Sequence, residues 1–382
     1  MSTRFAALLC VVSFTAEARG GEADFTSDLL SGGDLSAFAL HQCEAAFEGG
    51  ALVLKSGNGL VHTLQRHGDF VLELEWRAHK TAKWDSGIYV RSELPAAGKP
   101  WPDRYQINLS EGDEGRLVGT DVRAPRDLVR KGDWNRFVII ARGKDLSLEI
   151  NGKPAWKHTG IEAADGFIGL QSEVPAGGEF EFRNVKVTES GYAPIFNGKD
   201  LSGWRGATQG YSVEKGSLVC RKDGGVNLYT EREYADFSVR FDFKLEPGGN
   251  NGLGIRAPLE GDAAYTGMEV QILDDGHASY KDIQPWQAHG SIYGIAAARR
   301  GHLRPAGQWN SEEVICRGRR AKVLLNGAVI VDVDLDEAST PKTLDGKGHP
   351  GLKRPKGHLA FLGHGHRVEI RNLRVRELGS SQ

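Results

Sequence analysis

Apolar and polar residues alternate with a period of two along most of the chain, which is the pattern of half-buried β-strands. In "DFVLELEWRA", residues 69–78, every second side chain from Phe70 to Trp76 is apolar, and "DFSVRFDFKL", residues 236–245, repeats this arrangement. Asn-Gly dipeptides at 151–152 and 326–327 stand between apolar runs and predict tight hairpins, because both residues tolerate a positive φ. Many short strands joined by Gly-rich turns predict an all-β protein built as β-sandwiches or jelly rolls.

The second half of the chain repeats the first half in the same order. "LLSGGDLSAF" (29–38) matches "IFNGKDLSGW" (195–204), "GDWNRFVII" (132–140) matches "GQWNSEEVI" (307–315), and "GFIGLQSE" (166–173) matches "GHLAFLGH" (357–364). Such collinear matches indicate a duplicated domain, and their period is too long for a solenoid, so each copy is expected to have its own core. The predicted domains are residues 25–189 and 194–378.

The N-terminal sequence predicts export. Arg4 precedes an apolar run from Phe5 to Ala16, and Ala16-Glu17-Ala18 has the small-x-small pattern of a cleavage site. We therefore interpret residues 1–18 as a signal peptide of a secreted or periplasmic protein, with a short buried N-terminal helix as the alternative. No other stretch approaches the roughly 20 apolar residues that a membrane span requires.

Composition limits the classes of partner. The 382 residues include 48 Lys and Arg against 50 Asp and Glu, a net charge of -2, so no overall charge attracts nucleic acid or an anionic membrane surface. Beyond the signal peptide three cysteines remain, Cys43, Cys220 and Cys316, and their surroundings show no metal-ligand spacing. We interpret them as structural thiols, with a Cys220–Cys316 disulfide as the alternative if their strands are neighbours.

The duplication provides an internal control for candidate chemistry, because a residue that serves the fold alone should occur in both copies. In the first copy, "RYQINLSEGDEG" places Gln106 opposite Gln271 and Arg104 opposite Glu269, and "EGRLVG" places Glu114 and Val118 where the second copy has a histidine and a tyrosine. Chemically useful side chains are thus concentrated in the second copy: Glu269, Gln271, Asp274, His277, His289 and Tyr293.

Each candidate also has a plainer interpretation. Arg256 has a counterpart in Arg91, which is consistent with a structural ion pair or with a shared role in anchoring a ligand. His277 and His289 are either ordinary loop histidines or groups that exchange protons or bind a metal. His364 in "GHGH" is a lower-ranked site residue, since i, i+2 spacing alone is weak evidence for a metal. Motifs for a nucleophilic serine, a nucleotide or a dinucleotide are absent from the sequence.

Several motifs together resemble one known family. "FNGKDLSGW", "GGNNGLGIR", "GMEVQILDDGH", "GQWN" and "GHLAFLGHG", all in residues 194–378, are similar in order and spacing to the 3-keto-disaccharide hydrolase domain family, and the first copy is a weaker match. The resemblance implies a concanavalin-A-like, glucanase-like jelly roll that is usually exported and acts on 3-keto-glycosides or binds sugars. Members described in this group include 3-keto-glucoside 1,2-lyases and 3-keto-2-hydroxy-glucal hydratases.

This substrate class suggests roles for the candidate residues. A ketone at C3 acidifies the C2 proton, so a base can form an enolate that expels the group at C1, and water added back completes a net hydrolysis. The base is then His277 or Glu269, the electrophile Arg256 or a bound divalent ion, and the proton donor Tyr293 or His289. The predicted substrate-binding residues are Arg256, Gln271, Asp274, Trp286 and His364.

Two other functions remain open from the sequence. In a non-catalytic, lectin-like protein, Trp84, Trp101 and Trp286 would stack on sugar faces, and jelly rolls host lectins as readily as enzymes. A conventional glucanase would show acids in a pattern such as Glu-x-Asp-x-x-Glu along one strand, which neither copy contains. A division of labour, in which the first copy binds a polymer and the second acts on it, is also consistent with the pattern.

Overall fold

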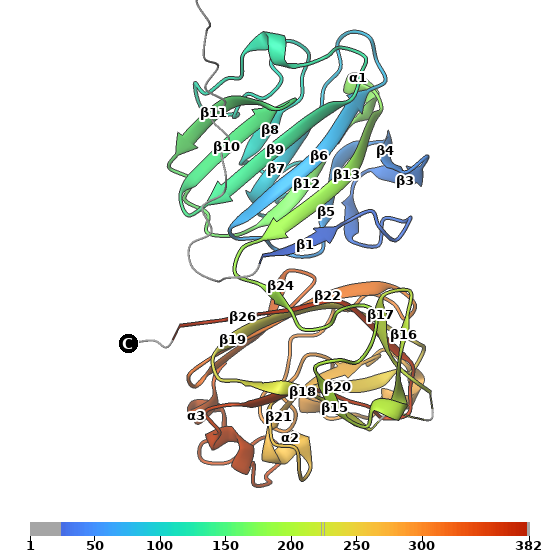
Figure 1. Ribbon diagram of the computed structural model, residues 1–382, viewed down its shortest axis with the longest axis vertical. Coiled ribbons are helices and arrows are strands. Elements are labelled where there is room, and N and C mark those ends of the chain that lie inside the picture. The colour runs from blue at the N-terminus through green and yellow to red at the C-terminus, as the bar shows by residue number, and fades with distance from the viewer. Residues whose placement is uncertain (1–23, 223, 225, 380–382) are drawn as a thin grey trace, which may run out of the picture.

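The computed structural model describes residues 24–222, 224 and 226–379, which form two β-sandwiches placed end to end (Figure 1). The signal peptide predicted for residues 1–18 lies outside the described residues. Each sandwich has its own hydrophobic core, one built from residues between Leu30 and Val187 and the other from residues between Phe196 and Val375. The all-β class and the tandem sandwiches predicted from the alternation and the repeat are therefore confirmed.

The first domain packs an eight-stranded sheet against a five-stranded one. The large sheet has the order β11-β10-β9-β6-β13-β4-β3 with β1 on β13, and the small sheet has the order β2-β5-β12-β7-β8. The elements are β1 (Phe25–Asp28), β2 (Phe38–His41), β3 (Glu44–Glu48), β4 (Ala51–Ser56), β5 (Asn58–Thr63), β6 (Phe70–Ala78), β7 (Gly87–Ser92), β8 (Gln106–Asn108), η1 (Arg126–Leu128), β9 (Asn135–Arg142), β10 (Asp145–Ile150), β11 (Lys153–Thr159), β12 (Phe167–Glu173), α1 (Val174–Gly177) and β13 (Phe180–Glu189).

The second domain repeats this topology. Its large sheet has the order β16-β17-β26-β19-β22-β23-β24 with β14 on β26, and its small sheet has the order β15-β18-β25-β20-β21. The elements are β14 (Ala193–Pro194), β15 (Trp204–Gly206), η2 (Thr208–Gly210), β16 (Tyr211–Glu214), β17 (Ser217–Cys220), β18 (Asn227–Tyr234), β19 (Phe237–Leu245), β20 (Asn250–Ala257), α2 (Ala263–Thr266), β21 (Met268–Leu273), η3 (Ala278–Tyr280), η4 (Pro285–Gln287), β22 (Trp309–Arg317), β23 (Arg320–Leu325), β24 (Ala328–Asp334), α3 (Leu335–Ala338), η5 (Pro350–Lys353), β25 (Gly357–Leu362) and β26 (Val368–Glu377).

The strand pattern of the sequence agrees with the burial of the side chains. Along β6, buried and half-buried residues alternate, as expected for a strand with one face in the core. Both Asn-Gly dipeptides close hairpins, with Asn151 at φ 52° between β10 and β11 and Asn326 at φ 49° between β23 and β24. Strand β19 is buried on both faces over most of its length, because its outer face meets the first domain.

Two further sequence expectations concern cysteines and membranes. Cys220 on β17 and Cys316 on β22 are free thiols, because β26 and β19 lie between their strands, so the alternative disulfide does not form. Within the part of the chain that the structure describes, no helix has the length and apolarity needed to cross a membrane.

A buried cluster of charges joins the two domains. The carboxylate of Glu189, at the end of β13, lies between Arg240 of β19 and Arg374 of β26, and Arg374 Nε donates to Glu189 Oε2 over 2.8 Å. Burial by itself would raise the pKa of Glu189, but the two arginines outweigh it and hold the pKa well below its ordinary value. Arg240 also donates to Glu313 Oε2 at 2.8 Å, so the cluster continues along the back of the second domain.

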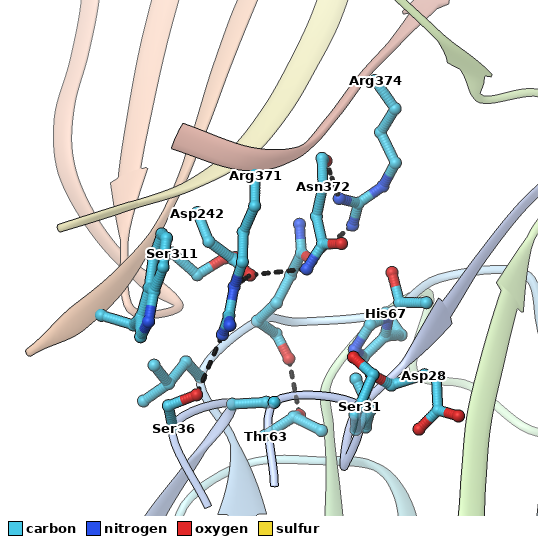
Figure 2. A pocket seen from close by; sticks show the side chains of 17 residues that line it. Asp28, Ser31, Ser36, Thr63, His67, Asp242, Ser311, Arg371, Asn372 and Arg374 are labelled. Atoms are coloured by element: carbon cyan, nitrogen blue, oxygen red, sulfur yellow. Dashed lines mark hydrogen bonds and ion pairs between the residues drawn. The ribbon is translucent and has the colours of Figure 1, made fainter. Parts of the chain in front are cut away.

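A cavity of about 50 Å³ lies beside this cluster, between the loops of the first domain and the back sheet of the second. Figure 2 shows Arg371 reaching across it, where its Nη2 donates to Ser36 Oγ over 2.9 Å. Arg374 likewise donates to Gln65 Oε1 over 2.6 Å. The domains are therefore joined by ionic and hydrogen-bonded contacts as well as by the chain.

Replacing Glu189 with alanine should destabilise the protein by about 3–5 kcal/mol, because Arg240 and Arg374 would be left buried without a counter-charge. Urea unfolding followed by tryptophan fluorescence measures this loss. Glu93→Ala is the control, because Glu93 pairs with Arg66 but its side chain is 74% exposed, and a change below about 1 kcal/mol is expected. Equal effects of the two substitutions would contradict the role given to Glu189.

Candidate active site

A polar pocket of about 210 Å³ opens on the small sheet of the second domain. Strands β20 and β21, the end of β25 and the loops around α2, η3 and η4 form its walls. Its polar lining residues are Asn250, Asp262, Tyr265, Glu269, Gln271, Tyr280, Gln287, Tyr293 and His364, and its apolar ones are Ala264, Leu273 and Ile283. Four residues singled out from the sequence, Glu269, Gln271, Tyr293 and His364, thus come together here.

Glu269 lies in the middle of β21, and only 4% of it is exposed. Its carboxyl group lies across Gly252 on the neighbouring strand, where an added Cβ would come within 1.9 Å of Glu269 Oε1. That oxygen has no hydrogen-bond partner among the described residues. Gly252 therefore leaves room for the buried carboxyl group of Glu269, whose Oε1 is not engaged by another described residue.

Burial raises the pKa of Glu269, the nearby carboxylate of Asp262 adds to this effect, and together they bring the pKa to about 8. His364 Nε2 lies 4.0 Å from Glu269 Oε1, but it is not close enough for a hydrogen bond. Partial burial lowers the pKa of His364, and His366 adds to this effect. Near neutral pH the two groups are therefore largely uncharged, and Glu269 is suited to exchange a proton with a bound molecule.

Two polar side chains border Glu269. Gln271 lines the pocket, and its Nε2 donates to Asn250 Oδ1 over 3.0 Å. Gln287 Nε2 donates to the hydroxyl of Tyr293 over 3.4 Å, and the ring of Trp286 packs edge-on against Tyr293 with centroids 5.0 Å apart. Burial raises the pKa of Tyr293, so its hydroxyl keeps its proton and can donate it in a hydrogen bond. Trp286 touches the site through Tyr293 and does not itself line the pocket.

The acids and the histidine that follow β21 shape a turn instead of facing the pocket. Asp274 Oδ2 accepts from the backbone of Gly248 at 2.9 Å, and His277 Nδ1 accepts from the backbone of Ser279 at 3.3 Å at the start of η3. His277 thereby caps η3 and satisfies a backbone donor that a short helix leaves free, and Asp274 holds the loop between β19 and β20. The structure therefore gives Asp274 and His277 local structural contacts and does not bring them to the site.

His289 lies in the core behind the site. Its Nδ1 accepts from the backbone of Leu273 at 3.1 Å, its Nε2 lies 3.2 Å from Glu312 Oε2, and its ring stacks on Phe243 with centroids 5.1 Å apart. Only 3% of His289 is exposed. Its imidazole is therefore occupied by the core and does not face a bound molecule.

Arg256 is likewise placed away from the pocket. It is 2% exposed, donates to the carbonyl of Gly318 at 2.9 Å and pairs with Asp236 at 3.1 Å. Arg91 makes the corresponding contacts in the first domain, with the carbonyl of Gly143 and with Asp69 at 2.7 Å. Of the two sequence-based interpretations of this arginine, the contacts match the structural ion pair.

The strand register corrects one alignment between the copies. Gly254 pairs with Glu269 in the second domain, and Tyr89 pairs with Gln106 in the first, so Gln106 and not Arg104 occupies the position of Glu269. The sequence alignment was shifted by two residues, an error that leaves the in-and-out pattern of a strand unchanged. The match of Tyr293 with Val118 holds, because the two residues make the same backbone hydrogen bond. The N–H of Tyr293 donates to the carbonyl of Glu269, and the N–H of Val118 donates to the carbonyl of Gln106, each over 2.9 Å.

In the first domain the corresponding place is filled by side chains that bind one another. The hydroxyl of Tyr89 donates to Gln106 at 3.2 Å, Gln106 donates to Gln171 at 2.6 Å, and Gln171 donates to Glu173 at 3.0 Å. Glu173 stands where the second domain has His364, as the register of β12 and β25 shows. The first domain therefore has an amide in place of the buried acid and a tyrosine in place of Gly254.

Comparison with known proteins places the chain in a family. A family model described as the 3-keto-alpha-glucoside-1,2-lyase-like domain matches it twice, over residues 26–188 and 191–376. The chain belongs to this family. It therefore consists of two lyase-like domains in tandem, and the resemblance inferred from the sequence motifs is confirmed.

Individual relatives are more distant. A 3-keto-disaccharide hydrolase of Bacteroides thetaiotaomicron is 23% identical over 240 residues, covering 52% of this chain and 83% of the relative. Two crystal structures from Parabacteroides distasonis, each provisionally described as a glycosyl hydrolase, are 28% and 26% identical, with TM-scores of 0.45 and 0.44. Each match covers 49% of this chain, and 99% and 94% of the other chain respectively.

Sequence reasoning missed several residues of the second lyase-like domain. Tyr265 and Asp262 come from the connection between β20 and β21, and Tyr280 comes from η3. These three residues have no matched position in the first copy, and the candidates were chosen from matched positions. Extra length in the second copy marks the connection after β21, which carries Tyr280, and residues 335–356 between β24 and β25. The connection that carries Tyr265 and Asp262, residues 258–267, is shorter than its counterpart at 93–105, so length gave no signal there.

Two sequence-based expectations about ligands also bear on the lyase-like domains. Within residues 24–222, 224 and 226–379, no group of three or more His, Cys, Asp or Glu side chains is placed to hold a metal ion. The divalent ion considered as an electrophile therefore has no such ligand set among these residues. Trp84 is buried in the core of the first domain, so it is not available to stack on a sugar. Trp101 donates its Nε1 to the carbonyl of Ser172.

Glu269→Gln should stabilise the protein at alkaline pH. The pKa of Glu269 rises from 4.5 to about 8 on folding, so the wild type loses stability as pH increases through this interval, up to about 5 kcal/mol. Glutamine does not ionise, and the first domain already holds Gln106 at this position. Urea unfolding at pH 4 and pH 9 should therefore show a variant that matches the wild type at pH 4 and exceeds it at pH 9.

The exposed acid Glu231 provides the control for this measurement. Glu231→Gln should leave the difference between the two pH values unchanged. A Glu269→Gln variant with no gain at pH 9 would mean that the carboxyl group finds a partner or water that lowers its pKa again.

Proposed function

We propose that the second domain cleaves 3-keto-glycosides by elimination at C1–C2 followed by hydration, with Glu269 as the base. The observation that supports this most is a buried carboxyl group in a polar pocket of about 210 Å³, with a pKa of about 8 and with Oε1 lacking a hydrogen-bond partner among the described residues. Membership of the lyase-like family and the name of the Bacteroides relative point to the same substrate class.

The reaction begins with removal of the C2 proton. The Glu269 carboxylate takes this proton, which the neighbouring ketone has made acidic, and the electron pair moves toward the C3 oxygen. A desolvated carboxylate is a stronger base than one in water, so the raised pKa favours this step. The hydroxyl of Tyr293, held by Gln287, can donate a hydrogen bond to the enolate oxygen that forms.

Loss of the group at C1 and addition of water complete the reaction. The enolate expels the glycosidic oxygen, giving a 2-hydroxy-glycal with a ketone at C3 and a free alcohol. Water then adds to C1 while protonated Glu269 returns its proton to C2, so the base is regenerated. Gln271 is positioned to bind a sugar hydroxyl through its amide oxygen.

A lectin-like role is less well supported by the site. Groups that bind sugar hydroxyls are normally paired with one another or with water, whereas Glu269 Oε1 is buried without a partner among the described residues. A carboxyl group in this condition costs stability and suits proton transfer better than binding. Glu269 is therefore the residue through which the two functions can be separated.

Glu269→Gln should lower the release of hexose from 3-keto-trehalose at least about 100-fold, since general-base catalysis contributes roughly 10²–10⁴-fold. In the wild type, kcat/KM should rise with pH up to a plateau above a pKa of about 8, because only the carboxylate can act as the base. Glu173→Gln in the first domain is the matched control and should retain full activity. Turnover that is unaffected by Glu269→Gln, or a rate that falls from pH 6 to pH 8, would refute the assignment.

We also propose that the protein is exported, on the evidence of the charged, apolar and small-residue pattern in residues 1–18. Expression in a bacterial host should yield periplasmic protein whose N-terminus begins at residue 19. Replacing the apolar run with polar residues should keep the chain in the cytoplasm, and periplasmic recovery of that variant would contradict the proposal.

A further inference from the structure

Residues 335–356, which lie between β24 and β25, deliver a lysine to a tyrosine at the rim of the pocket. Lys347 Nζ donates to the hydroxyl of Tyr265 over 3.0 Å and also lies 5.2 Å from the centre of its ring. Tyr265 belongs to α2 and lines the same pocket as Glu269. A cationic donor is thus directed at a phenol oxygen that borders the space available to a substrate.

The segment that carries Lys347 is firmly held. The hydroxyl of Thr343 donates to the carbonyl of Lys347 at 2.7 Å, and the backbone of Lys347 donates to Asp345 Oδ1 at 3.0 Å. The side chains of Asp345 and His349 are almost fully buried and lie 3.2 Å apart. Gly294 leaves room for this pair, because an added Cβ would lie 2.7 Å from Asp345 Oδ2.

The same pair supports the ring of Tyr265. The imidazole of His349 packs against it with centroids 4.7 Å apart, and the hydroxyl of Tyr265 lies 3.5 Å from Asp345 Oδ2. The ring of Tyr293 also packs edge-on against Tyr265, with centroids 6.4 Å apart. Tyr265 is therefore fixed in position, and its oxygen lies between a cation, an acid and the pocket.

The two tyrosines of the pocket have different partners. Tyr293 receives a hydrogen bond from the neutral amide of Gln287, which suits a phenol that stays protonated. Tyr265 receives one from an ammonium group, which stabilises the negative charge that develops when a phenol gives up its proton. Of the two, Tyr265 is the one arranged to lose and regain a proton.

We propose that Tyr265, positioned by Lys347, gives its proton to the glycosidic oxygen that leaves C1 and takes a proton from the water that later adds there. This inference rests on the proposed function. As the C1–O bond breaks, its electron pair takes the Tyr265 proton, giving a free alcohol and a phenolate. As water attacks C1, the phenolate takes one proton from it and the remaining hydroxyl group bonds to C1. Glu269 returns to C2 the proton that it removed in the first step, so both groups are restored.

Two substrates that differ in the leaving group test this role. Tyr265→Phe should lower cleavage of a 3-keto-glucoside with a hexose leaving group at least about 100-fold, because an alkoxide leaves poorly without a proton. Cleavage of the corresponding 4-nitrophenyl 3-keto-glucoside should fall less than about 5-fold, since nitrophenolate leaves without help. Tyr280→Phe is the comparison within the pocket, because the Tyr280 hydroxyl donates to the carbonyl of Gly248, and the ratio of the two rates should not change.

Lys347 variants separate proton transfer from simple anchoring of the loop. Lys347→Met should lower cleavage of the hexosyl substrate about 10-fold and leave the nitrophenyl substrate unchanged, and Lys347→Arg should restore part of the loss. A loop that is merely anchored would lower both rates together. Circular dichroism and urea unfolding confirm that each variant is folded.

The outcomes distinguish this inference from the proposed function. If the wild type cleaves neither substrate, the proposed function fails. If the wild type cleaves both and Glu269→Gln cleaves neither, but Tyr265→Phe leaves the ratio of the two rates unchanged, the proposed function stands and the role of Tyr265 is overturned.

Discussion

The rest of the site depends on one constraint, which is that the carboxyl group of Glu269 is buried and its Oε1 has no hydrogen-bond partner in the part of the chain that the structure describes. A carboxylate in such a position is costly, and the protein accommodates it by keeping the group protonated over much of the neutral range. The strand beside it carries glycine at 252, because an added Cβ there would come within 1.9 Å of Glu269 Oε1. The surrounding polar groups, Gln271 and Tyr293, are held by other residues and leave the acid free.

The duplicated domain shows how small a change separates an open site from a closed one. The sandwich, the buried arginine and the pairing of strands are the same in both copies, yet Tyr89 at the position of Gly254 brings a ring and a hydroxyl to Gln106. A chain of amides then uses the polar groups that would otherwise bind a ligand. The same fold therefore carries an open pocket in one copy and a filled one in the other, and a few side chains on three neighbouring strands make this difference.

The sequence predicted the features that depend on local pattern. It did not predict which way a side chain points or what segments that differ between the two copies contribute to the pocket. Alternation identified the strands, and Asn-Gly located both hairpins, because period and turn chemistry act within a few residues. Glu269, Tyr293 and His364 were singled out because the matched positions of the first copy carry other residues, and with Gln271 they line one pocket of the structure. His277 and His289 were ranked too high, because the presence of an imidazole near a strand end does not reveal whether it caps a turn or enters the core. Lys347 was missed because residues 335–356 are much longer than the matching connection of the first copy, and Tyr265 was missed because the β20–β21 connection differs from its counterpart in length and sequence.

The junction between the domains explains why the pocket can be formed by one domain alone. Glu189 binds Arg240 and Arg374 on the outer face of the large sheet, so the first domain covers the back of the second. Figure 1 shows α2 and β21 at the end of the molecule away from this junction. The residues that line the pocket all lie between Asn250 and His364, so the first domain contributes no side chain to it. The first domain instead contacts the back sheet of the second, where Glu189 forms buried ion pairs with Arg240 of β19 and Arg374 of β26.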